Sequence, residues 1–271
     1  FGLLRYDAPD PKSFVESWAY EASRIFRDRL VSNENRAKFD NILYSVLRQN
    51  LKFDETLDGV YYTALSSTEF CALPGVPLLM RMNKEDFVHV IQQGLTNYER
   101  ELIELDLPLF DEMLDYIAYE DRNLSRPGGS MLLAGQSGVG RKKTVSLVAH
   151  MLRMEFFSFS ISRGYSIKEF KRDLKVVLQS AGVEGKPQVL YVEDHHLIQH
   201  EFLELLNSLV SAGEIPGLYN PEELEPLLAP LKDEMAQNYR YKTVYDFFVS
   251  RIQENLRIIF AFDPEHPNFF Q

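Results

Sequence analysis

Four short apolar runs, separated by stretches of helical periodicity, dominate the second half of the sequence. The runs, which we predict to be strands, are 131–134, 156–161, 189–192 and 258–262. The stretches between them, which we predict to be helices, are 142–153, 166–178 and 201–210. Strands that are apolar along their whole length and alternate with helices are typical of a parallel sheet with helices on both faces. This half of the chain therefore predicts an α/β fold.

The first 80 residues predict a small helical unit instead. Apolar residues recur at helical spacing within 14–30 and 35–51, and the first stripe, which includes Trp18 and Phe26, is predicted to be core. Glycine and proline within 74–77 interrupt regular structure. We therefore predict a helical domain at 1–80 and a sheet domain at 81–271, in which the glycine- and proline-rich stretch 211–241 is an insertion.

Composition and charge disfavour several classes of function. The formal charge of −11, from 40 acidic and 29 basic residues, repels a phosphate backbone, so we expect no nucleic-acid partner. Cys71 is the single cysteine and cannot form an internal disulfide, and no apolar stretch approaches the roughly 20 residues of a membrane-spanning helix. We expect a cytoplasmic protein without membrane insertion and, because no initiator Met opens the chain, a piece of a longer one.

A glycine-rich turn joins the first predicted strand to the helix that follows it. The turn and the start of the helix consist of Gly135, Gln136, Ser137, Gly138, Val139, Gly140, Arg141, Lys142 and Lys143. In P-loop proteins such glycines let backbone N–H groups surround a polyphosphate at a helix N-terminus. A turn without a ligand is the alternative, but three glycines at this spacing after a strand favour a binding role. We predict that residues 135–143 bind ATP or ADP.

The turn departs from the standard pattern at its end. There the last glycine is followed by Lys, which reaches the β- and γ-phosphates, and by Ser or Thr, which holds Mg²⁺. Arg141 and Lys142 stand at these positions. Arg141 still supplies positive charge, but Lys142 has no oxygen for the metal and Thr144 lies too far along the helix. The phosphate cradle is therefore predicted to be intact, whereas the metal-binding hydroxyl is lost.

Acidic residues follow two of the predicted strands. In P-loop ATPases an Asp-Glu pair at such a strand end holds Mg²⁺ and polarises the attacking water, and here the order is reversed, as Glu193-Asp194. We predict Glu193 at the metal position, so that Mg²⁺ is still possible, and the shorter Asp194 at the catalytic one. Asp263 follows the last strand, where it adds negative charge near the γ-phosphate. Together these features predict weak or absent hydrolysis.

Three histidines, His195, His196 and His200, follow the acidic pair and resemble a metal-binding cluster. Adjacent histidines on a loop that leads into a helix are more often solvated. We therefore predict that these side chains are exposed.

Several short segments resemble the ring modules of dynein heavy chains. Residues 18–30 resemble the small-subdomain helix with its Trp-x-His-Glu…Arg-x-Phe-x-Asp-Arg-Leu pattern, with Tyr20 in place of His. The turn described above, 202–209, 213–219 and 251–256 resemble the fourth AAA+ module of that family. The matches span nearly the whole chain in the right order. The Gly140-Arg141-Lys142 departure and the Glu193-Asp194 order are most similar to the dyneins of retrograde intraflagellar transport.

The resemblance implies an organisation and a function. Residues up to about 80 would close the third module, with Arg24 as its sensor arginine, and the remainder would be the large subdomain of the fourth. The implied partners are neighbouring AAA+ modules of the same heavy chain, a microtubule bound through a stalk outside this chain, and accessory chains bound through the tail. The implied location is the cytoplasm, the cytoskeleton and the cilium.

Three functions are compatible with these features. The preferred one is a regulatory nucleotide-binding module of a minus-end-directed motor, because clustered positive charge at Arg141 and Lys143 beside a helix N-terminus is unfavourable without an anion. The second is a purely structural ring segment with an empty site. A free-standing P-loop enzyme that phosphorylates a small molecule is third, because it would need a metal-binding Ser or Thr and a lid.

Overall fold

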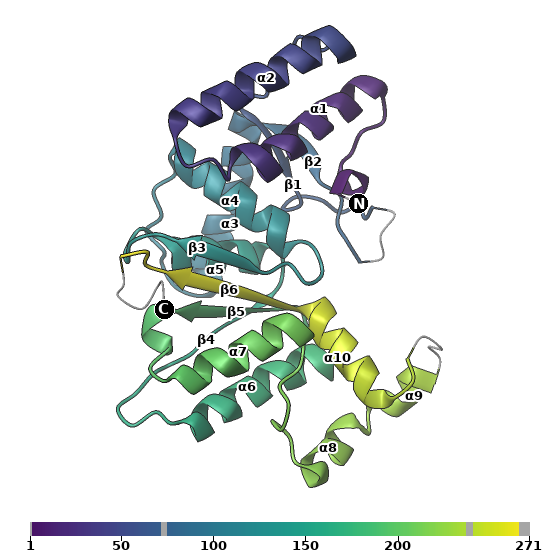
Figure 1. Ribbon diagram of the computed structural model, residues 1–271, viewed down its shortest axis with the longest axis vertical. Coiled ribbons are helices and arrows are strands. Elements are labelled where there is room, and N and C mark those ends of the chain that lie inside the picture. The colour runs from purple at the N-terminus through teal and green to yellow at the C-terminus, as the bar shows by residue number, and fades with distance from the viewer. Residues whose placement is uncertain (1, 72–74, 237–240, 266–271) are drawn as a thin grey trace. The chain divides into compact units, whose positions relative to one another are not determined.

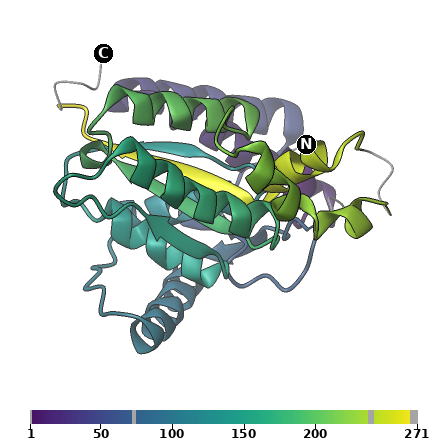
Figure 2. The ribbon, with the colours of Figure 1, turned by 90° about the horizontal axis from the view of Figure 1, so that it is seen from below.

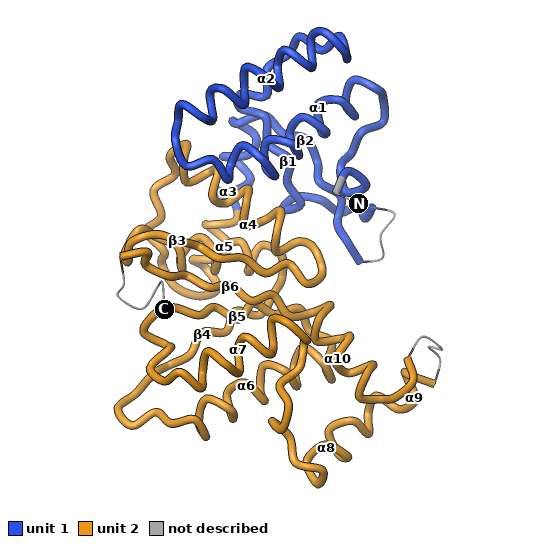
Figure 3. The backbone as a smooth tube through the Cα atoms, in the orientation of Figure 1, with its two compact units in different colours: residues 1–93 blue, residues 94–271 orange. Residues whose placement is uncertain are grey.

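The chain divides into two compact units, residues 1–93 and 94–271 (Figure 3). The structure is a computed structural model, and it describes residues 2–71, 75–236 and 241–265. The division falls later than the predicted boundary near residue 80. The reason is that β2 (Met80–Asn83) pairs antiparallel with β1 (Val60–Thr63), so a boundary at 80 would separate two strands of one sheet.

Unit 1 contains the predicted helices and also the β1–β2 pair, which was not predicted. Its helical elements are η1 (Gly2–Arg5), α1 (Pro11–Ala22), the π-helical η2 (Ser23–Arg27), α2 (Asn33–Leu51) and the first part of α3 (Lys84–Glu101). Asp10 starts α1, because its Oδ1 accepts hydrogen bonds from the backbone N–H groups of Lys12 and Ser13 at 2.8 and 3.0 Å. The two strands are four residues each and lie far apart in the sequence, so they give little local signal.

The prediction that the apolar stripe with Trp18 and Phe26 forms core is wrong. Trp18 is 37% exposed and Phe26 is 60% exposed. The opposite side of α1 is buried instead, where Tyr20 packs with Tyr6 and Tyr62 at ring-centroid distances of 6.2 and 5.0 Å. The π-helical turn that follows changes the angular spacing of side chains, so a regular three- and four-residue periodicity does not extend to Phe26.

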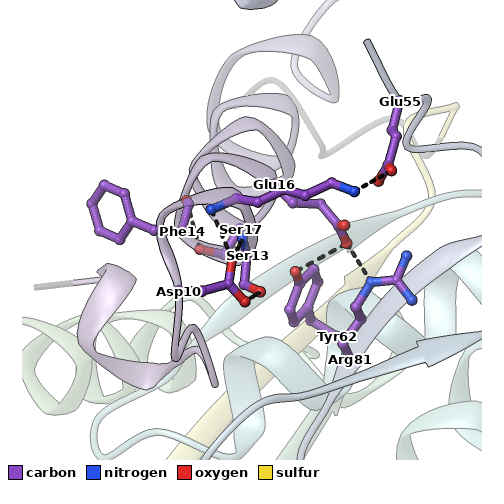
Figure 4. Close-up of polar contacts among 9 residues, drawn as sticks. Asp10, Ser13, Phe14, Glu16, Ser17, Glu55, Tyr62 and Arg81 are labelled. Atoms are coloured by element: carbon purple, nitrogen blue, oxygen red, sulfur yellow. Dashed lines mark hydrogen bonds and ion pairs between the residues drawn. The ribbon is translucent and has the colours of Figure 1, made fainter. Parts of the chain in front are cut away.

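A buried carboxylate joins α1 to the β1–β2 pair (Figure 4). Glu16 of α1 is 6% exposed and accepts hydrogen bonds from Tyr62 Oη of β1 at 3.1 Å and from Arg81 Nε of β2 at 2.6 Å. Burial and the nearby Glu16 charge raise the pKa of Tyr62, so its hydroxyl stays protonated and donates. Because a buried charge needs such partners, Glu16 fixes how the helix lies on the strands.

Replacing Glu16 with Ala is expected to lower the free energy of unfolding of unit 1 by about 1.5–3 kcal/mol, the usual contribution of hydrogen bonds to a charged group. Urea unfolding followed by the fluorescence of Trp18, the single tryptophan, measures this change. The matched control is Glu55→Ala, which removes the exposed ion pair with Lys12 and should cost less than about 1 kcal/mol. Equal effects of the two substitutions would contradict this role for Glu16.

Unit 2 is a parallel sheet with helices on both faces, which confirms the predicted fold class. The strands β3 (Met131–Ala134), β4 (Glu155–Ser158), β5 (Gln188–Glu193) and β6 (Leu256–Phe262) pair in the order β3-β6-β5-β4. The helical elements are α4 (Asp111–Leu124), α5 (Arg141–Met151), α6 (Ile167–Gly182), η3 (Asp194–His196), α7 (His200–Ala212), α8 (Pro221–Leu228), α9 (Leu231–Ala236) and α10 (Val244–Asn255). Figures 1 and 2 show α4 and α5 on one face of the sheet and α6, α7 and α10 on the other.

The predicted elements of unit 2 differ from the observed ones mainly at their ends. β4 stops at Ser158, three residues before the predicted end of its strand. The predicted capping box of Ser166 and Glu169 is present at the start of α6. The stretch predicted as an insertion contains α8 and α9, and α10 was not predicted. No helix among the described residues is long and apolar enough to cross a membrane.

The parallel pairing determines where the site lies. Because all four strands run in one direction, their carboxyl ends meet at one edge of the sheet. Gly135 follows β3, Asp194 follows β5 and Asp263 follows β6, so this edge collects the residues predicted to form the site.

Candidate nucleotide site

The loop between β3 and α5 has the backbone conformation that its glycines predict. Gly138 and Gly140 have φ values of 90° and 92°, a region that other residues rarely adopt. A Cβ at Gly138 would meet no atom within 4 Å, so the backbone angle and not lack of space requires glycine there. Gly140 precedes α5 without a side-chain cap, which leaves the first-turn N–H groups of the helix directed toward the loop.

Arg141 connects the loop to the strand ends. Its Nη1 donates hydrogen bonds to the carbonyl oxygens of Phe262 at 2.8 Å and of Leu133 at 3.2 Å. The Phe262 carbonyl also accepts the N–H of Gly135 at 3.0 Å. The guanidinium therefore stabilises the contact between β3, β6 and the start of the loop.

Lys142 and Glu193 lie next to one another on the α5 side of the sheet. Successive side chains of β5 point to opposite faces of the sheet. Leu190 and Val192 lie in the core with α6 and α7, so Tyr191 and Glu193 point to the face that carries α5. Lys142 Nζ lies 3.9 Å from Glu193 Oε2, donates to Ser158 Oγ at 3.3 Å and stands 5.9 Å from the centroid of the Tyr191 ring. An ammonium thus occupies the space between the carboxyl ends of β4 and β5.

The positive charges beside the loop all have protein partners, since Lys143 Nζ donates to the carbonyl oxygen of Asp106 at 3.1 Å. Arg141 and Lys143 are hydrogen-bonded within the protein, so their charges do not require a bound anion, contrary to the prediction. Both side chains are thus directed away from a phosphate, and its binding would rest mainly on the backbone of the loop and on the start of α5.

Glu193 and His196 cap the short helix η3 reciprocally. The Glu193 carboxylate accepts the backbone N–H of His196, and the N–H of Glu193 donates to His196 Nδ1 at 2.9 Å. His196 is 1% exposed, so the prediction that it is solvated is wrong, whereas His195 and His200 are exposed as predicted. Burial, with the neighbouring His195 and Lys142 charges, lowers the pKa of His196 to about 4.

The ring geometry of His196 disfavours a metal in this cluster. One ligand atom from each of Glu193, His195 and His196 lies within 4.8 Å of the others. Nδ1 of neutral His196 accepts a hydrogen bond, so its Nε2 carries the proton and neither nitrogen has a free lone pair.

Asp194 and Asp263 meet at the ends of β5 and β6. Asp194 Oδ2 accepts the backbone N–H of Asp263 at 2.8 Å, and Asp263 Oδ1 accepts the N–H of Glu265 at 2.9 Å. Both carboxylates thus stabilise the local backbone. Their roles in catalysis stay predictions.

The residues at this edge do not fit Mg²⁺. Magnesium requires oxygen ligands in near-octahedral geometry, and the Ser or Thr hydroxyl of the standard loop is replaced by the Lys142 ammonium. The Thr144 hydroxyl lies away from the loop, 2.7 Å from Glu120 Oε1 and 3.0 Å from the carbonyl oxygen of Arg141. Glu193, the predicted metal ligand, already receives a backbone N–H and has the ammonium beside it.

Glu120 of α4 is a buried carboxyl that contacts Thr144 of α5. The sequence did not predict it, because a single acidic residue in an amphipathic helix gives no signal of burial. Glu120 is 2% exposed, and burial raises its pKa to about 8 although the Thr144 hydrogen bond opposes the shift. Thr144 Oγ1 donates this hydrogen bond to Glu120 Oε1 at 2.7 Å, and Glu120 comes from a different helix than the one that follows the loop. Burial therefore outweighs the hydrogen bond in setting the pKa of Glu120.

Arg24 was predicted as a sensor residue in unit 1. It lies in η2, where its Nε is 3.1 Å from Asp28 Oδ2 and its guanidinium carbon is 5.0 Å from the Tyr20 ring centroid. The sensor role stays a prediction.

A glycine-rich loop between a strand of a parallel sheet and a helix, with acidic residues at the end of a neighbouring strand, defines a P-loop module of the AAA+ class. Comparison with known proteins then identifies the family. Residues 105–271 match the P-loop containing dynein motor region D4, and the chain belongs to the dynein motor family.

The chain is similar to the cytoplasmic dynein 2 heavy chain 1 of several organisms. Identity is 45% with that of Tripneustes gratilla, 46% with that of Homo sapiens and 39% with that of Chlamydomonas reinhardtii, each over 99% of this chain. The chain spans only 6–7% of the length of these relatives.

Replacing Glu120 with Gln is expected to flatten the dependence of stability on pH. In the folded chain Glu120 keeps its proton up to a pKa of about 8, whereas in the unfolded chain it loses the proton near the ordinary pKa of 4.5. The free energy of unfolding therefore falls as pH rises from 4.5 toward 8. Between pH 5 and 8 the native chain should lose at least about 1 kcal/mol more than the variant. Urea midpoints across this range measure the loss, and exposed Glu112→Gln is the control. Identical slopes for native chain and Glu120→Gln would contradict the prediction.

Proposed function

We propose that this chain is a nucleotide-binding regulatory module in the ring of a minus-end-directed dynein motor. The loop backbone carries the proposal: Gly138 and Gly140 are left-handed and the N-terminus of α5 has no side-chain cap, features suited to binding the phosphates of ATP or ADP. Residues 135–143 would form this site, with Arg141 holding the loop against the strand ends.

Hydrolysis at this site would be weak or absent. Asp194 at the catalytic position is a methylene shorter than the usual Glu, and its carboxylate accepts the N–H of Asp263. Lys142 offers no oxygen to a metal. Misplacement of a catalytic group by about 1 Å costs roughly 100-fold in rate, so a bound nucleotide would persist and act as a regulatory ligand.

The place of the chain in the ring rests on its relatives. Unit 1 would close the third module, with Arg24 facing that module's nucleotide, and unit 2 would form the large subdomain of the fourth. The exposed Trp18 and Phe26 support contact with another module, because large apolar side chains on a surface favour association.

The wider partners and the location follow the same relatives. Similarity to cytoplasmic dynein 2 heavy chains supports a role in retrograde intraflagellar transport, in the cytoplasm, cytoskeleton and cilium. The microtubule would bind through a stalk outside this chain, and accessory chains through the tail.

A purely structural ring segment is the second candidate. One observation favours it: Arg141, Lys142 and Lys143 each have a protein partner, so their charges do not by themselves require a bound anion. The two candidates differ in whether the loop holds a nucleotide.

The substitution Gly138→Asp is expected to reduce nucleotide bound at this loop by at least about tenfold, since it places a carboxylate beside the phosphates. The intact motor is labelled with a photoreactive nucleotide, and mass spectrometry of the labelled peptides separates this loop from other sites. The matched control is Gly217→Asp, because Gly217 has a φ of 70° and, like Gly138, no atom within 4 Å of an added Cβ. The structural candidate predicts no label at the loop in any of the three proteins.

A further inference from the structure

Lys142 stands at the helix position where P-loop proteins carry the hydroxyl that binds Mg²⁺. It is the second residue after Gly140, in the first turn of α5, and its side chain is 51% exposed. A lysine there changes the chemistry completely, because an ammonium has three donor hydrogens, no acceptor and a positive charge of its own.

The structure places this ammonium beside the predicted metal ligand. Lys142 Nζ lies 3.9 Å from Glu193 Oε2 and 3.3 Å from Ser158 Oγ. The first contact is longer than a hydrogen bond and the second uses one hydrogen, so at least one donor direction remains for another acceptor. A phosphate oxygen is an acceptor of the required charge.

The same arrangement disfavours a divalent ion. An ion held by Glu193 would lie close to the ammonium, and like charges at such distances repel strongly away from bulk water. Glu193 is also held in place by the N–H of His196, which it caps. Arg141 and Lys143 do not take this position, because their donors reach backbone carbonyls elsewhere.

We infer that the Lys142 ammonium takes the place of the divalent metal at this site, so that the module binds a nucleoside di- or triphosphate without Mg²⁺. The inference rests on the proposed nucleotide binding. It adds a specific consequence: occupancy of this site does not follow the concentration of free Mg²⁺, unlike that of a P-loop with a metal-binding hydroxyl.

The test uses the intact motor that contains this chain, labelled with photoreactive 2-azido-ADP either with Mg²⁺ or with excess EDTA. Mass spectrometry of the labelled peptides reads this loop separately from every other nucleotide site. The native loop should be labelled equally in the two buffers, within about twofold, since no metal contact is lost. Labelling only with Mg²⁺ overturns the inference and leaves nucleotide binding in place. Absence of label in both buffers overturns the nucleotide proposal and this inference with it.

Two substitutions at Lys142 test the metal-binding hydroxyl and the positive charge separately. Lys142→Thr restores the hydroxyl and should make labelling depend on Mg²⁺ by about tenfold or more. Lys142→Met removes the charge and should weaken labelling in both buffers. The matched control is Lys186→Met, because Lys186 is 52% exposed and pairs with Glu155 at the opposite end of β4. Unchanged labelling of Lys142→Met in EDTA contradicts the role of the ammonium, and the two-buffer comparison of the native motor does not depend on how the variants fold.

Discussion

The insertion of β6 between β3 and β5 is the constraint on which the site depends. Its carbonyl at Phe262 accepts hydrogen bonds from Gly135 and from Arg141, and the following residue, Asp263, donates its N–H to Asp194. These bonds connect the glycine-rich loop to the acidic strand end through the backbone of a segment more than a hundred residues away in the sequence. The geometry of the loop therefore depends on the whole sheet, and not on the loop sequence alone.

The site combines the backbone of a P-loop with side chains that differ from the standard pattern. Three cations beside a helix N-terminus would destabilise that end of α5, but each is neutralised or hydrogen-bonded by a neighbouring element. Within the described part of the chain, Lys142 is the one of the three that lies beside a carboxylate. That pairing links the first turn of the helix to the end of β5, which is where a metal would make the same link in a standard P-loop.

Sequence patterns predicted the sheet well because its strands are apolar, short and separated by helices, and β3 has the predicted limits, 131–134. They failed where contacts are distant or backbone geometry is irregular. The β1–β2 pair joins two separated segments, and the π-helical turn after α1 breaks the periodicity that placed Phe26 in the core. At the site, residue types predicted the strand-end cluster, but not the burial of His196 or the turn of Arg141 toward carbonyls, because both depend on neighbours from other elements.

A high-resolution structure of the intact motor, prepared with ADP and Mg²⁺, would show whether Lys142 stands in place of a metal. We expect nucleotide density against Gly138 and Gly140, with the Lys142 ammonium beside Glu193 and no metal ion between the two. A magnesium ion bound by Glu193 with Lys142 turned away would contradict the role of the lysine. A loop without nucleotide under these conditions would contradict the regulatory site itself and favour a structural segment of the ring.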